Sequence, residues 1–244
     1  MNTDRNAASH NSDLADLRLL HLADSALPIG ALAHSFGLES LAARELLTTN
    51  NLDEFLRSWL AENGILEGVF CREAFRVPMV ETGHARERWA QLNSLLSARK
   101  PAREGRLGSL TLGRNFLFTV MAVAELPLLG EILANPKGEV ELRRTGAHYC
   151  LAFGLVAAMQ GFDQHRTVLT FLHQSVAGMI SASQRLLPLG QTEAARILWN
   201  LKPPIVEAAE RSVAFNCQDV CSFMPLLEWG GMEHPALATR LFIS

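Results

Sequence analysis

An apolar helical stretch that stops at a Leu-Pro-Ile-Gly sequence constrains this chain more than any other feature. Leucines recur at three- and four-residue spacing over residues 14–22, which predicts an amphipathic helix that begins near Asp13 and runs to about Leu27. Pro28 ends this helix, because the residue before a proline avoids the α-helical region. A short segment of small and aromatic residues follows as far as Glu39. A helix, a fixed break and a loop in this order are typical of a protein that docks onto partners.

Helical periodicity continues through most of the chain, and alternating β-strand patterns are nearly absent. Asn51, with Glu54 three residues later, predicts a capping box at the start of a long helix that ends before Pro78. Residues 98–109 are expected to be irregular. Further helices are predicted over residues 35–46, 81–97, 110–124, 139–161, 164–187, 192–200 and 205–214.

The sequence therefore predicts an all-α fold, a single globular domain of roughly ten helices. This domain is expected to span residues 13–231, after a polar, disordered N-terminus over residues 1–12. Two glycines, Gly230 and Gly231, precede a short amphipathic C-terminal tail over residues 232–244. We expect this tail to move as a unit and to bind a partner, although docking on its own domain is the alternative.

Composition narrows the classes of function. The 244 residues are 48% hydrophobic and only 19% charged, so the chain needs a large core, a large interface, or both. The net charge of −3 gives no reason to expect nucleic acid as a partner. Residues 116–133 are the most apolar window, but charges and a proline interrupt them, so we expect buried helices rather than a membrane span. No signal peptide is evident, and four scattered cysteines are consistent with free thiols in a cytoplasmic protein.

No catalytic motif is visible in the sequence. The lysines lack the context of a phosphate-binding loop, and no pair of Glu-x-x-His motifs points to a di-iron bundle. Cys217 and Cys221 would lie one helical turn apart on a helix and would suit a soft metal, but two half-buried thiols are the commoner explanation. The alternative to a docking protein is an all-α enzyme or a helical bundle that binds a cofactor.

Arg185 ends a long predicted helix just before Pro188 and Gly190. Its charge would offset the negative end of the helix dipole, or it would contact an acidic partner, and the spacing favours neither. Near the chain end, Arg240, Leu241 and Phe242 combine a charge with apolar anchors, as binding segments often do.

Four segments in the same order resemble the UreF family of urease accessory proteins over nearly the whole chain, from about residue 17 to residue 244. These segments are ADSALPIGALAHSFGLE at 23–39, HYCLAFGLVAAMQG at 148–161, RLLPLGQTEA at 185–194 and TRLFIS at 239–244. Two positions depart from the family pattern. Leu32 stands where an aromatic residue is common, and Pro235 follows His234 where a glutamate is common.

The resemblance implies an all-α scaffold that forms a homodimer and binds the accessory protein UreD, also called UreH. Through that complex it implies recruitment of the GTPase UreG and nickel insertion into apo-urease. It implies no catalytic residue, no metal ligand and no cofactor. We expect the partner-binding residues to be Pro28, Gly30, His34, Ser35, Gly37, Glu39, Arg185, Gln191, His234, Arg240, Leu241 and Phe242.

The isolated chain is predicted to hold no stoichiometric zinc or nickel after dialysis, because the transfer of a metal between partners requires weak, exchangeable contacts rather than a closed site. Elemental analysis of the dialysed protein measures this directly. One tightly held metal ion per chain that is lost in the Cys217→Ser and Cys221→Ser variants would contradict the prediction.

Overall fold

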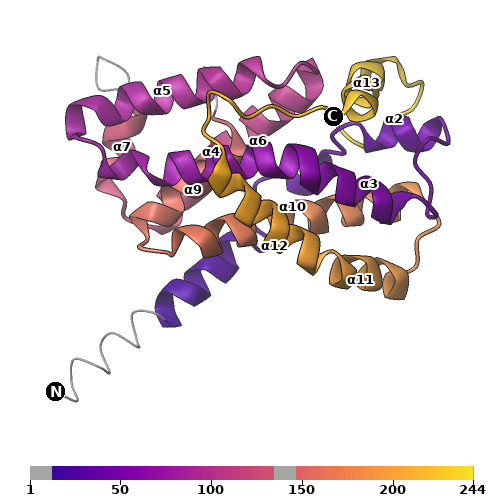
Figure 1. The fold of residues 1–244 in the computed structure, drawn as a ribbon, viewed down its shortest axis with the longest axis horizontal. Helices are drawn as coiled ribbons and strands as arrows, with labels where there is room; N and C mark the ends of the chain where they lie inside the picture. Colours follow the sequence, from indigo (N-terminus) through magenta and orange to yellow (C-terminus); the bar gives the residue numbers. More distant parts are fainter. Residues whose placement is uncertain (1–12, 135–146, 244) are drawn as a thin grey trace.

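The computed structural model describes residues 13–134 and 147–243, and all elements assigned within these ranges are helices (Figure 1). The prediction of an all-α fold is therefore confirmed. An N-terminal helix covers residues 13–22 and lies at the lower left of Figure 1. The other elements are η1 (Ala31–Ala33), α2 (Leu38–Ala43), α3 (Leu52–Trp59), the π-helical turn η2 (Leu60–Gly64), α4 (Ile65–Phe75), η3 (Val77–Met79), α5 (Thr82–Ala98), α6 (Arg103–Val123), α7 (Pro127–Leu133), α9 (Tyr149–Met159), α10 (Gln164–Leu186), α11 (Gln191–Asn200), α12 (Lys202–Arg211), η4 (Ser212–Ala214), α13 (Pro225–Glu233) and η5 (His234–Ala236).

The core is built on the contact between α4 and α9, which cross the centre of the molecule (Figure 1). Both helices are apolar around most of their circumference and buried along most of their length, as expected for central helices. Their backbones touch at Gly154, where a Cβ atom would lie 2.1 Å from the carbonyl oxygen of Cys71. Gly113 of α6 makes a similar contact, because a Cβ atom there would lie 1.9 Å from the carbonyl oxygen of Ala147.

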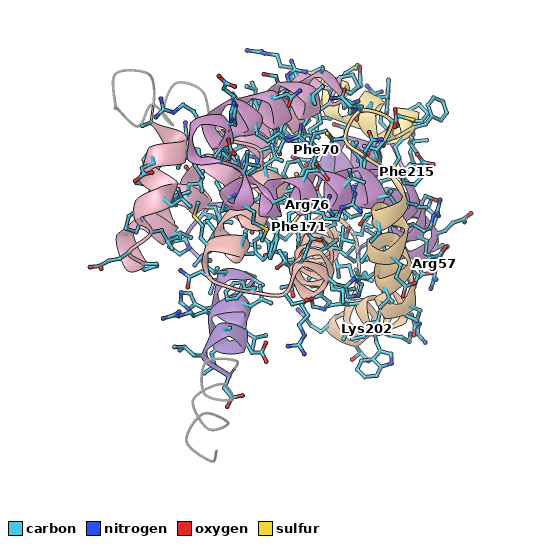
Figure 2. All side chains as sticks on the ribbon, turned by 60° about the vertical axis from the view of Figure 1, so that its left-hand side comes forward. Arg57, Phe70, Arg76, Phe171, Lys202 and Phe215 are labelled. Carbon is cyan, nitrogen blue, oxygen red and sulfur yellow. The ribbon has the colours of Figure 1, made fainter. Side chains whose placement is uncertain are left out.

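A cluster of aromatic rings joins the three long helices α6, α9 and α10. Phe116, Tyr149, Phe153 and Phe171 contact one another with ring centroids 5.5 to 6.3 Å apart. Such pairs contribute about 0.5–1.5 kcal/mol each beyond the area that they bury. Figure 2 shows Phe171 in the interior, whereas Lys202 lies at the outer edge.

Two predicted helix ends differ from the structure for local reasons. The first helix stops at residue 22, well before Pro28, because Asp24 forms a turn in which its carboxylate accepts a hydrogen bond from the amide of Ala26 at 2.8 Å. Asn51 precedes α3 but forms no capping box. Its side chain instead accepts from the amide of Thr48 at 2.8 Å and donates to the carbonyl of Leu46 at 3.0 Å.

Other predictions were closer. The long helix expected after Asn51 runs through α3, the π turn and α4 to Phe75, and α10, α11 and α12 lie within a few residues of their predicted ranges. The segment expected to be irregular before residue 110 is already helical from Arg103, where α6 begins. Residues 1–12 and residues 139–146 of one predicted helix lie outside the described part of the chain.

The π turn directs two polar side chains towards the segment that precedes α13. Glu62 accepts a hydrogen bond from the amide of Phe223 at 2.8 Å, and Asn63 bonds with Ser222. Single π turns inside α-helices frequently occur at functional sites. Here they tie the segment before α13 to the helix that begins at Leu52.

The cysteines do not have the helical spacing that a soft-metal pair would need. Cys217 and Cys221 lie in an irregular segment, with Cys217 buried and Cys221 exposed. The thiol of Cys217 accepts a hydrogen bond from Arg88 at 3.5 Å. Over residues 13–134 and 147–243, no group of three or more histidine, cysteine or acidic side chains is placed to hold a metal ion. Within the same ranges, no helix is both long and apolar enough to cross a membrane.

Gly154→Ala is predicted to lower the free energy of unfolding by about 2 kcal/mol or more, because the added methyl group has to push the backbones of α4 and α9 apart. Gly178→Ala is a matched control, since its Cβ atom would have no heavy atom within 4 Å and alanine favours a helix by up to about 1 kcal/mol. Urea unfolding of both variants measures the difference. Equal stabilities would show that the two helices do not depend on this contact.

Candidate functional site

The loop of the first motif owes its shape to two glycines with left-handed backbone angles. Gly30 has φ of +83° immediately before η1, and Gly37 has φ of +93° immediately before α2. Residues other than glycine rarely adopt these angles. The side chain of Asn115 on α6 holds the start of the loop by donating a hydrogen bond to the carbonyl of Ile29 at 3.0 Å.

Helix α2 packs directly on α13 through glycine. A Cβ atom at Gly37 would lie 2.8 Å from the amide nitrogen of Gly231, and one at Gly230 would lie 2.7 Å from the carbonyl oxygen of Gly37. Figure 1 shows the two helices side by side next to the C-terminus. Gly230 and Gly231, which were expected to precede a mobile tail, therefore lie inside a helix and form a close contact. The boundary expected at residue 231 falls within α13.

A buried histidine lies between two carboxylates where α2, α6 and η5 meet. The Nε2 atom of His234 is 2.9 Å from a carboxylate oxygen of Glu39, and its Nδ1 atom is 2.6 Å from a carboxylate oxygen of Glu104. The side chain of His234 is fully buried, and that of Glu39 is 6% exposed. These three side chains, here called the Glu–His–Glu cluster, connect the first motif with the chain end.

The chain end docks on the same glutamate. Glu39 accepts hydrogen bonds from the backbone amides of Leu241 at 2.6 Å and Phe242 at 3.2 Å. The amide of Ile243 donates to the carbonyl of Ala33 in η1 at 2.8 Å. The ring of Phe242 is buried, whereas Arg240, Leu241 and Ile243 are exposed. In this structure, residues 241–243 are thus held on the domain itself, and of the expected anchors only Phe242 is buried there.

Arg185 of the third motif contacts both the loop and the chain end. Its guanidinium donates to the carbonyl of Leu32 at 2.7 Å and lies 4.2 Å from the centre of the Phe242 ring. The second contact is a cation–π interaction. Neither contact is with an acidic group, so within this chain the residue fastens the loop and the chain end together, in addition to lying in the last turn of α10.

The remaining predicted residues lie at different distances from the Glu–His–Glu cluster. Within the loop, Ser35 and His34 are buried, and the ring of His34 stacks on that of Phe36. Burial lowers the pKa of His34, and the nearby Glu104 opposes that shift. Pro28 is exposed ahead of η1. Gln191 accepts a hydrogen bond from Gln184 at the start of α11.

The loop also covers a cavity of about 480 Å³ that reaches between α6 and α10. Leu32, His34 and Phe36 line its loop side, and the Lys100–Glu67 ion pair, 2.5 Å between charged atoms, lines another part. Burial disfavours the charged form of Lys100, but Glu67 outweighs that effect and raises its pKa. Because the loop lies over open space, its position depends on the contacts that fasten its edges.

The second motif belongs to the core. His148 is fully buried, and its two ring nitrogens lie 2.8 Å from the hydroxyl of Ser97 and 3.0 Å from that of Ser109. Burial, helped by Lys100 and Arg106, lowers the pKa of His148 to about 3, so the ring is neutral near pH 7. Its role is to join α5, α6 and the start of α9.

Two residues of the site were missed in the sequence. Glu104 lies in a stretch that was expected to be irregular, so no helical register linked it to the rest, and Asn115 looked like an ordinary polar residue of a helix. The acidic residue in the first turn of α6 was the available signal for Glu104, because carboxylates favour helix N-termini.

The fold and this site define an all-α protein whose motif residues fix backbone segments from distant parts of the chain against one another. The model of the UreF family matches residues 46–202. Urease accessory protein UreF of Corynebacterium glutamicum (strain R) is 33% identical over 94% of this chain and 98% of its own length. UreF of Haemophilus influenzae (strain PittGG) is 32% identical over 98% and 100%, and UreF of Actinobacillus pleuropneumoniae serotype 5b is 30% identical over 93% and 97%.

The chain belongs to the UreF family of urease accessory proteins. This family is not catalytic, so the alternative of an all-α enzyme is set aside.

Gly30→Val is predicted to lower the free energy of unfolding by more than about 1 kcal/mol, because valine is strained at a φ of +83°. Crowding is not the cause, since the nearest heavy atom to a Cβ at this position lies 4.0 Å away. Gly30→Asn should cost less, because asparagine tolerates left-handed angles. Thermal melts of the two variants measure the difference, and valine no worse than asparagine would refute the backbone argument.

Proposed function

We propose that this chain is a cytoplasmic scaffold in urease maturation that binds UreD, also called UreH, and with it recruits the GTPase UreG for nickel insertion into apo-urease. We propose further that it works as a homodimer. Membership of the UreF family supports the role in urease maturation. The partners and the dimer are proposals that follow from the resemblance of the motifs.

The observation that best supports a docking role is an exposed apolar stripe next to the docked chain end. Phe223, Leu226, Trp229 and Met232 follow one another at three-residue spacing along α13 and the residue two before it. All four are exposed, with Phe223 at 78% and Met232 at 57%. Exposed apolar surface of this kind marks interaction sites in proteins that are otherwise well packed.

The chain end extends the apolar character of this region. Leu241 and Ile243 are 63% and 69% exposed, and the adjoining loop exposes Leu32 at 50%. Because Gly37 packs on α13, the loop and the stripe belong to one packed region, on which Glu39 holds the chain end. We propose that UreD binds across this region, and that residues Arg240 and Leu241 contact it directly.

Met232→Glu and Phe223→Glu are predicted to weaken capture of UreD at least tenfold, because each places a charge in an apolar interface. Trp199→Glu is the matched control, since Trp199 is 70% exposed on α11. The measurement is the amount of UreD that co-purifies with each purified variant, checked against its thermal melt.

Full capture by Met232→Glu and Phe223→Glu would refute this assignment of the surface.

Arg185→Ala tests the contacts that hold the loop and the chain end beside this surface. Since Arg185 fastens both Leu32 and Phe242, its loss should lower urease activation in a reconstituted system while leaving the helical content unchanged.

A further inference from the structure

The cavity beneath the loop of the first motif is bordered by glycines of two helices. Gly105 of α6 and Gly178 of α10 both line it, and a Cβ atom at either position would have no heavy atom within 4 Å. Glycine is less favourable than alanine inside a helix. At Gly113 and Gly154 a close backbone contact requires glycine, but within the described residues no neighbouring atom requires it at positions 105 and 178.

Gly178 lies on the face of α10 that is turned to the loop. Phe171 and Gln174, seven and four residues earlier, line the same cavity. Arg185, seven residues later, donates a hydrogen bond to the loop at Leu32. Residues at these spacings share one face of a helix. A side chain at position 178 would therefore project into the space between α10 and the loop, and glycine leaves this space open.

The cavity has the size and the lining of a small-molecule site. Its volume of about 480 Å³ lies within the range of roughly 300–1,000 Å³ that is usual for ligand pockets. Buried apolar side chains from α6 and α10 line it, among them Leu112, Phe171 and Met179. Such walls suit a ligand with an apolar body, and the few polar groups among them determine its chemistry.

One wall carries an ion pair with unused hydrogen-bonding capacity. Lys100 Nζ lies 2.5 Å from one carboxylate oxygen of Glu67, and the two side chains are only 16% and 15% exposed. An ammonium group has three hydrogens and a carboxylate has two oxygens. Within the described residues, this contact is the one hydrogen bond that either side chain makes. The pair can therefore donate to and accept from one further group in the cavity.

The charges on this wall balance. Two cationic and two acidic side chains line it, namely Lys100, Arg106, Glu67 and Glu228. Arg106 donates to a backbone carbonyl at 2.6 Å, and Glu228 accepts from a backbone amide at 2.8 Å. Burial lowers the pKa of His34 and His173, which also line the cavity, so both rings are neutral near pH 7. This balance favours an uncharged ligand.

The loop side of the cavity contains an aromatic residue with a strained backbone. Phe36 has φ of +51° and Gly37 has φ of +93°, in a turn that is closed by a hydrogen bond from the amide of Leu38 to the carbonyl of Ser35 at 3.1 Å. Turns with positive φ at both central residues favour Asn-Gly, and a bulky residue there is an outlier. The ring of Phe36 stacks on that of His34, and both residues line the cavity. An aromatic ring is thus held at the cavity although the backbone disfavours it.

We propose that this cavity binds a small, uncharged molecule that has a carboxamide group and an aromatic body. A carboxamide presents an acceptor and a donor side by side, so its carbonyl accepts from Lys100 while its N–H donates to Glu67. Its ring lies against the apolar walls that Phe36 closes on the loop side.

The test is a titration of the isolated, ¹⁵N-labelled chain with benzamide, followed by the chemical shifts of the backbone amides. The expected result is saturable shifts at Gly105, Gly178 and the loop, with a dissociation constant of about 1 mM, an ordinary value for a ligand of this size. Shifts that do not saturate at a tenfold higher concentration would overturn the proposal. Shifts confined to the exposed stripe on α13 would also overturn it.

Three relatives of benzamide test the chemical class. N,N-dimethylbenzamide lacks the N–H donors, benzoate is charged, and acetamide lacks the ring. Each should bind at least about fivefold more weakly than benzamide, because each loses a hydrogen bond, the charge balance or the apolar contact. Benzoate or N,N-dimethylbenzamide that binds as tightly as benzamide would overturn the assignment of the carboxamide to the ion pair.

Cavity-filling variants assign the binding to this site. Gly178→Leu should weaken benzamide binding at least about tenfold because its side chain occupies the cavity, and it should fold because leucine favours a helix more than glycine does. Gly105→Leu makes the same test from α6. Gly130→Leu is the matched control, since Gly130 of α7 has equally open surroundings but does not line the cavity. Wild-type affinity in both cavity-filling variants would overturn the proposal.

Phe36→Asn tests the aromatic residue on the loop side. Asparagine tolerates left-handed backbone angles, so this variant keeps the turn and removes the ring. Benzamide binding should weaken at least about fivefold with the loss of the apolar contact. Unchanged affinity would overturn the role of Phe36 in the site. Since the titrations use the isolated chain, their outcome does not depend on whether UreD is a partner.

Discussion

The close approach of α4 and α9 at Gly154 is the contact on which the rest of the structure depends. A glycine there brings the two helix backbones together, so the remaining long helices can pack around a narrow, largely apolar centre. Gly113 brings α6 to the start of α9 in the same way, and His148 is fixed beside that contact by two serines. The N-terminal half of α6 is thereby placed rigidly, and with it Glu104, far from the centre.

Away from the centre, the contact between α2 and α13 also depends on glycines. Gly37 and Gly230 allow α2 and α13 to touch, which brings Glu39 within reach of a histidine nearly two hundred residues later in the chain. The polar cluster that results is buried and joins three helical elements. Buried polar groups that are fully hydrogen-bonded define one arrangement of the chain, whereas the same groups left unpaired are costly. The chain end therefore binds in one register, set by the two oxygens of Glu39.

The sequence predicted the fold class because helical periodicity is local, and it predicted α10 and α11 closely because polar and glycine residues bound them. It also marked Glu39, Arg185 and Phe242, which the structure brings together. It did not predict how they meet. The turn at Asp24 and the hydrogen bonds of Asn51 depend on which neighbouring backbone group each side chain binds, and periodicity does not predict this. Glu104 and the packing of Gly37 on Gly230 depend on contacts distant in the chain, which periodicity does not record.

The exposed stripe on α13 and the docked chain end belong to the same part of the fold, but only the chain end is held by hydrogen bonds to a buried carboxylate. An apolar stripe that is always accessible favours association with any apolar surface. Release of the chain end leaves the buried carboxylate of Glu39 without two of its hydrogen-bond donors, so it is costly even though the freed amides can bond to water. Phe242 adds to this cost, since its ring must leave the guanidinium of Arg185 and become exposed. A partner that offers Phe242 an apolar pocket would offset that loss, so the same residue that holds the chain end in the free protein would strengthen its binding in a complex.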